Sequence, residues 1–96
     1  MTRYKQTLTQ ETAAALNLDR ARDAAIALTE FVKVKEPTAG SLADIKAQSI
    51  EEYLIDLLAD LRHWCRTEEV DFGRSDELAA AHFNAELDEE LEGGAA

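Results

Sequence analysis

The fold is decided by residues 50–65, which read IEEYLIDLLADLRHWC. The large apolar residues of this stretch recur three or four positions apart, so in a helix they would share one face. They are Ile50, Leu54, Leu57, Leu61 and Trp64, widened into a broad stripe by Tyr53, Leu58 and Cys65. The opposite face would carry Glu52, Asp56 and His63, which suits contact with water. We therefore expect one strongly amphipathic helix whose apolar stripe forms the core of the protein.

A loop is predicted before this main helix, because Pro37 disfavours helical geometry in the residue that precedes it and Gly40 frees the backbone to turn. Ser41 and Asp44 then have the spacing of a capping box. This spacing predicts that the main helix begins at about Leu42.

An earlier helix is predicted over residues 10–33, since apolar residues recur at helical spacing from Ala21 to Val32. Asn17 and Asp19 could interrupt it, because their side chains compete for backbone hydrogen bonds. The alternation at residues 31–35 also suits a strand, which leaves open a short N-terminal β-ribbon with residues 3–8.

A last helix is predicted from Ser75 or Asp76, either of which could cap it, to about Leu91. Residues 67–74 have no helical period and are expected to form a loop that Val70 and Phe72 anchor under the helix ends. The last helix has two apolar faces, which suggests that it packs against the main helix on one side and a second subunit on the other.

The expected fold class is therefore all-α, a compact bundle of three to four helices forming a single domain over residues 1–92 and followed by a disordered tail at 93–96. A chain of 96 residues buries only roughly 60–65% of its unfolded surface, so its own core stabilises it weakly. A homodimer is expected for that reason.

The charge of the chain is concentrated in its second half. Residues 49–96 hold fourteen acids against three arginines, a net charge of −11, whereas residues 1–48 are close to neutral. Such a surface repels nucleic acid and anionic membranes and attracts a protein partner with a basic surface. Cys65 is the single cysteine and no long apolar segment is present, which favours the reducing cytoplasm and argues against a membrane protein.

No catalytic machinery is recognisable, so we expect neither an enzyme nor a cofactor. The serines lack the context of a nucleophile, the glycines form no phosphate-binding loop, and Cys65 lies on the apolar stripe as a buried structural residue. Asp60 with His63, and His82 with Glu86, have the spacing of helical metal ligands. We expect no metal, with His63 at the surface and His82 half-buried and structural, and keep a metal-dependent helical-bundle enzyme as an alternative.

Acidic residues of the main helix and of the loop after it are the candidate interaction face. They are Glu51, Glu52, Asp56, Asp60, Glu68, Glu69 and Asp71. Such clusters most often serve solubility. The functional hypothesis is docking of a basic protein, and its alternative is an acidic DNA mimic that inhibits a DNA-binding protein or nuclease.

Three short segments resemble an uncharacterised group of small helical proteins from bacterial genomes, phages and plasmids. They are residues 58–65 (LADLRHWC), 70–72 (VDF) and 81–86 (AHFNAE). The resemblance implies a shared packing unit and an origin in a mobile element, and it carries no activity. The expected function is a non-enzymatic protein–protein interaction module, an accessory or host-directed factor of a phage or plasmid.

Overall fold

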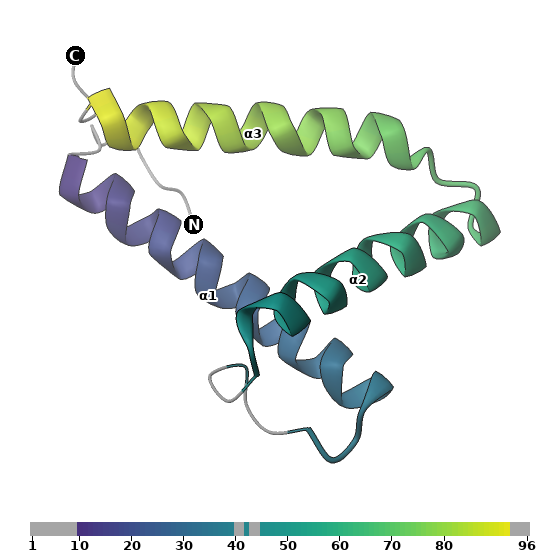
Figure 1. The fold of residues 1–96 in the computed structure, drawn as a ribbon. Coiled ribbons are helices and arrows are strands. Elements are labelled where there is room, and N and C mark those ends of the chain that lie inside the picture. The colour runs from purple at the N-terminus through teal and green to yellow at the C-terminus, as the bar shows by residue number, and fades with distance from the viewer. Residues whose placement is uncertain (1–9, 40–41, 43–44, 93–96) are drawn as a thin grey trace, which may run out of the picture. The chain divides into compact units, whose positions relative to one another are not determined.

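The computed structural model describes residues 10–39, 42 and 45–92, and all of the regular structure in these ranges is helical (Figure 1). Three helices follow one another, α1 at Gln10–Lys35, α2 at Ala47–Thr67 and α3 at Phe72–Glu92. No strand occurs in the described ranges, so the expected all-α class is confirmed at this level. Residues 1–8 and 93–96, which carry the predictions of a ribbon strand and a tail, lie outside the described residues.

The chain divides into two compact units. The first unit contains Met1–Arg22 and Ser75–Ala96, and the second contains Asp23–Arg74. The first half of α1 and nearly all of α3 therefore belong to the first unit, while the second half of α1 and all of α2 belong to the second.

Helix α1 runs without interruption through the two residues that could have broken it, Asn17 and Asp19. It also includes residues 31–35, so their alternating pattern is part of a helix rather than a strand. The Glu36 amide donates to the Val32 carbonyl over 2.7 Å, and the Ala39 amide donates to the Glu36 carbonyl over 2.9 Å. The helix thus ends in a turn around Pro37, as the sequence predicts.

Helix α2 begins at Ala47, not at the predicted Leu42, because Lys46 is extended with φ −63° and ψ 143°. The Ile45 amide donates to the Leu42 carbonyl over 3.2 Å just before that break. Had the helix continued back to Leu42, Ile45 would have fallen on the polar face. The break at Lys46 lets both Leu42 and Ile45 be half-buried.

Helix α2 ends in a Schellman motif, with Glu69 in the left-handed region at φ 59°. The Val70 amide donates to the Cys65 carbonyl over 2.8 Å and the Glu69 amide donates to the Arg66 carbonyl over 3.4 Å. Glycine is the residue that usually takes this position, since a side chain there strains the backbone.

Helix α3 begins at Phe72, three residues earlier than the predicted cap at Ser75. The Asp71 carboxylate accepts a hydrogen bond from the Arg74 amide over 3.0 Å, so Asp71 acts as the N-cap. The Arg62 guanidinium lies 4.3 Å from the centre of the Phe72 ring, which ties the first turn of α3 to α2 within the second unit.

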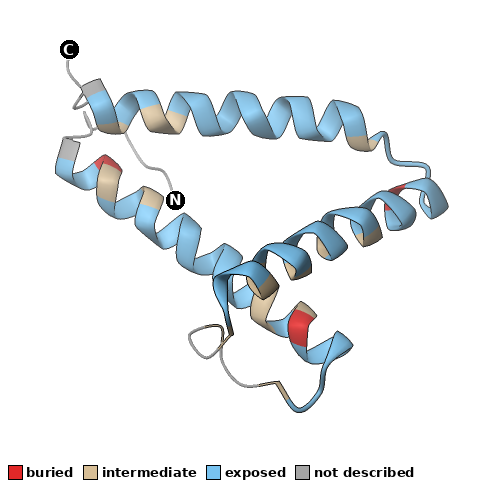
Figure 2. Cartoon of the chain, in the orientation of Figure 1, coloured by how far each residue is buried: buried red, intermediate tan, exposed pale blue. Residues whose placement is uncertain are grey.

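Burial is sparse among the described side chains (Figure 2). The buried residues are Ala13 at 2% exposure, Val32 at 1% and Cys65 at 7%, which agrees with the structural role predicted for the cysteine. The apolar stripe of α2 is not enclosed as expected, since Leu54, Leu61 and Trp64 remain 44%, 40% and 56% exposed. The physical reason is that in the second unit only the last part of α1 lies beside α2, which covers one flank of a broad stripe. The compact bundle remains a prediction.

Candidate interaction surface

The structure places four of the predicted acidic residues on α2 and separates them by face. Glu52, Asp56 and Asp60 follow one another at four-residue intervals and form one row along the helix. Glu51 lies about 100° around the helix from Glu52, toward the apolar side. Glu51, Glu52 and Asp56 are exposed, whereas Asp60 is half-buried.

Asp60, at the end of the acidic row, is already paired. Its carboxylate lies 2.8 Å from the Lys35 ammonium, whose nitrogen also lies 5.2 Å from the centre of the Phe31 ring. The hydrogen bond to Asp60 raises the pKa of Lys35 above its ordinary value of 10.5, as does the charge of Asp60, while desolvation by burial lowers it. The charge of Asp56 adds to the rise. Lys35 therefore compensates one end of the row, and Glu52 and Asp56 form no ion pair within the described residues.

A shallow hollow of about 420 Å³ lies beside these two carboxylates. Ser49, Glu52, Tyr53, Ile55 and Asp56 line it. Two carboxylates next to an aromatic ring and a branched aliphatic side chain suit a lysine or arginine, which buries its hydrocarbon stem while its charged end meets the acids.

Glu68, Glu69 and Asp71, the remaining acidic residues of the predicted face, surround the junction between α2 and α3. All three are exposed. Glu68 lies about 24 Å from Glu52 along the helix axis, so the two groups do not form one continuous patch. Glu69 holds the left-handed position and Asp71 caps α3. Each of these two residues therefore has a local structural role.

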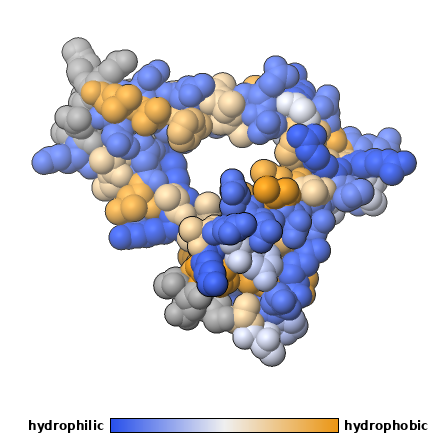
Figure 3. Space-filling model, viewed as in Figure 1, coloured by the Kyte–Doolittle hydropathy of each residue, from blue (hydrophilic) through white to orange (hydrophobic). Residues whose placement is uncertain are grey.

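The sequence did not indicate how much apolar surface α2 leaves open. Leu54 and Leu58 are each 44% exposed and Leu61 is 40% exposed. Apolar patches also appear on the surface drawn in Figure 3, interspersed with charged groups. The residues themselves were predictable from helical spacing, but their exposure depends on which elements pack against α2.

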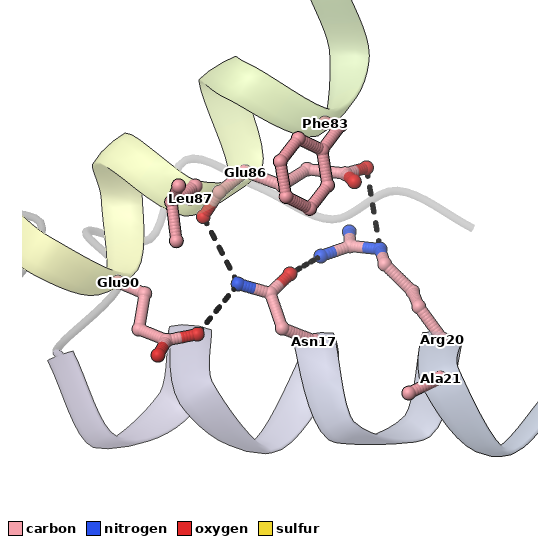
Figure 4. Close-up of a pocket in the computed structure, with 7 residues that line it drawn as sticks. All are labelled: Asn17, Arg20, Ala21, Phe83, Glu86, Leu87 and Glu90. Atoms are coloured by element: carbon pink, nitrogen blue, oxygen red, sulfur yellow. Dashed lines mark hydrogen bonds and ion pairs between the residues drawn. The ribbon is translucent and has the colours of Figure 1, made fainter. Parts of the chain in front are cut away.

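A second site that the sequence missed lies in the first unit, between the first half of α1 and α3 (Figure 4). The Asn17 side-chain nitrogen donates to the Glu86 carbonyl over 3.0 Å and to the Glu90 carboxylate over 2.9 Å. Arg20 donates to the Asn17 side-chain oxygen over 2.6 Å and lies 3.3 Å from the Glu86 carboxylate. An asparagine expected to weaken α1 instead connects it to α3.

This network borders a pocket of about 310 Å³ whose apolar lining comes from Ala21, Phe83 and Leu87. Its polar groups already bond to one another, and the Phe83 ring is 61% exposed. We interpret the pocket as the edge of a helix contact held by hydrogen bonds, since no unpaired polar group in its lining is left to bind a ligand.

The two histidines are both exposed. This confirms the surface position predicted for His63 and contradicts the half-buried position predicted for His82, because in the first unit only the C-terminal part of α3 meets α1. The residues paired with these histidines in the metal hypothesis are engaged elsewhere, Asp60 with Lys35 and Glu86 with Arg20. Within the described ranges, no three side chains of His, Cys, Asp or Glu lie close enough to share a metal ion.

None of the described helices is both long enough and apolar enough to span a bilayer. No protein-family model, curated protein or solved structure matches the chain.

Proposed function

We propose that this chain is a non-enzymatic protein-interaction module that binds a basic surface of another protein through Glu52 and Asp56. The observation that carries the proposal is the hollow on α2, in which these two carboxylates stand beside Tyr53 and Ile55. Both acids are exposed, and neither forms an ion pair with another residue that the structure describes. A lysine or arginine of the partner enters this hollow.

The net charge of −10 supports the same kind of partner, because it attracts basic proteins over distances of about one Debye length, roughly 8–10 Å at physiological salt. An extended imitation of DNA would need a longer series of open charges. The charge of Asp60 is compensated by Lys35. The next acidic residue of the predicted face, Glu68, lies about 24 Å from Glu52 along the helix axis. Two open carboxylates support a single basic anchor better than a DNA mimic.

The resemblance of residues 58–86 to small proteins of phages and plasmids belongs to this proposal as its cellular setting. In that setting the chain is an accessory or host-directed factor of a mobile element.

The test uses an arginine-rich peptide as the probe and nuclear magnetic resonance to locate its binding. Addition of the peptide should shift the amide signals of residues 49–56 more than those of the acidic segment 86–90. The combined change Glu52→Gln and Asp56→Asn should weaken binding roughly 3–30-fold, as expected for two exposed charge pairs, and the wild-type affinity should fall as salt rises.

The matched control is Asp88→Asn with Glu89→Gln, which removes the same charge from exposed positions of α3. If the control weakens peptide binding as much as the α2 variant does, only net charge matters and the site is refuted. An affinity that does not change with salt would also refute it.

A further inference from the structure

Leu54, Leu58 and Leu61 form an apolar surface on α2 that no described residue of the second unit encloses. We call these three residues the open face of α2. Their side chains are 40–44% exposed. They lie about 100–160° around the helix from Asp60, the residue that pairs with Lys35 of α1. The last part of α1 therefore covers the other flank of the apolar stripe.

Two residues of the open face, Leu54 and Leu61, belong to a heptad pattern that suits pairing with another helix, and Leu58 lies beside this pattern. From Ile50 to Trp64 the large apolar residues alternate between intervals of four and three, which is the spacing of helices that pack side by side. A helix that packs on this face would meet leucines at successive turns.

Charged residues on one flank of the open face indicate which helix packs against it. Glu51 lies seven residues before Leu58, and Arg62 and Arg66 lie four and eight residues after it. Along the axis this places Glu51 about 10 Å on one side of Leu58 and Arg66 about 12 Å on the other. Arg62 contacts the Phe72 ring, whereas Glu51 and Arg66 form no ion pair within the described residues.

We propose that the open face binds the open face of a second copy of this chain, with the two α2 helices antiparallel and their two-fold axis near Leu58. In this arrangement Glu51 of each copy lies opposite Arg66 of the other, and the helix dipoles oppose one another favourably. In a parallel pair the two-fold axis would run along the helices, so the flank with Glu51 and Arg66 would face the opposite flank of the partner and these two residues would not meet. The charge pattern therefore selects the antiparallel dimer.

The size of the surface sets the strength of this dimer. Helix α2 has 21 residues and is about 31 Å long, so a face roughly 10 Å wide offers each copy on the order of 300 Å² of projected area. The two copies together offer on the order of 600 Å², which is below the roughly 1,200 Å² of stable specific interfaces, so the dimer is weak. We expect a dissociation constant in the micromolar range, so the dimer forms and dissociates with concentration.

The dimer is independent of the proposed basic partner, because the hollow with Glu52 and Asp56 faces the opposite side of α2. Failure of one proposal leaves the other standing, and each has its own variants.

Sedimentation velocity of the full chain from about 1 to 300 µM measures the self-association. The wild type should shift from single-chain mass toward dimer mass. Leu58→Gln should weaken the dimer at least tenfold, while Leu78→Gln, a matched change at a 49% exposed leucine of α3, should leave it unchanged. Single-chain mass at every concentration, or equal effects of the two variants, would overturn the proposal.

Charge reversal tests the orientation and does not depend on the apolar substitution. Glu51→Arg and Arg66→Glu should each weaken the dimer roughly 5–30-fold, since each reversal affects two symmetric pairs. The double variant restores opposite charges only in an antiparallel pair, so its affinity should return close to that of the wild type. A double variant no tighter than either single variant would refute the arrangement, and circular dichroism should confirm unchanged helix content in all four proteins.

Discussion

Asn17 should be the most sensitive polar residue of the first unit. It donates two hydrogen bonds to α3, one to the Glu86 carbonyl and one to the Glu90 carboxylate, and it accepts one from Arg20. Asn17→Ala removes all three while keeping a helix-forming residue in α1. Arg20 keeps its contact with the Glu86 carboxylate at 3.3 Å, so part of the link between the helices survives.

The magnitude follows from the bonds that are lost. Two partly buried hydrogen bonds between helices contribute about 0.5–1.5 kcal/mol each, and the one to a carboxylate lies at the upper end of this range. Alanine recovers about 0.5–0.7 kcal/mol through its higher helix propensity. The net loss of stability should therefore be about 1.3–2.5 kcal/mol, a substantial part of the 5–15 kcal/mol typical of a small domain.

Urea denaturation followed by circular dichroism measures this loss, and the other asparagine provides the control. Asn84 is exposed on α3 and forms no hydrogen bond within the described part of the chain. Asn84→Ala should leave stability unchanged or raise it slightly, through helix propensity alone. If the two variants have the same urea midpoint, the hydrogen bonds of Asn17 do not stabilise the fold and the argument is refuted.

Two further predictions concern the second unit. Glu69→Gly should stabilise the protein by up to about 1 kcal/mol in urea denaturation, because glycine adopts the left-handed conformation at φ 59° without steric strain; destabilisation would contradict this. The pKa of Lys35 is raised in the folded state, so the stability from its ion pair is fully present below 10.5 and is lost as the pH rises through the folded pKa. The urea midpoint of the wild type should therefore fall as the pH rises through the folded pKa of Lys35, and Lys35→Gln should make this fall smaller. If the urea midpoints of the variant and the wild type depend on pH in the same way, the ion pair of Lys35 with Asp60 does not stabilise the fold.

Local sequence patterns predicted the existence and approximate extent of the three helices, because helical periodicity and turn residues act over short distances. The first helix was predicted to begin at residue 10, as observed, and Pro37 ends it within a few residues. The boundaries that were wrong involve choices between competing caps. The spacing of Ser41 and Asp44, which lie outside the described residues, favours a cap at Ser41, but α2 begins after Lys46, where a break half-buries both Leu42 and Ile45.

The acidic residues of the candidate site were identifiable from the sequence, but their availability was not. Asp60 and Asp56 look equivalent in the helical pattern. Only the position of Lys35, 25 residues away in the chain, distinguishes them, since its ammonium lies 2.8 Å from Asp60. A pairing between different helices leaves no local signal, which is also why the sequence indicates Asn17 only as a residue that could interrupt the first helix.

By itself, the sequence determined that the chain is helical, that its charge is strongly negative in the second half, and that one helix carries a broad apolar stripe. These properties depend on local spacing and composition. The tertiary structure decided which part of each surface is occupied. It buried Val32 and Cys65, covered one flank of the stripe and left Leu54, Leu58 and Leu61 exposed. Whether an apolar face is buried depends on which element packs against it. Helical spacing in the sequence identifies the face but not that element.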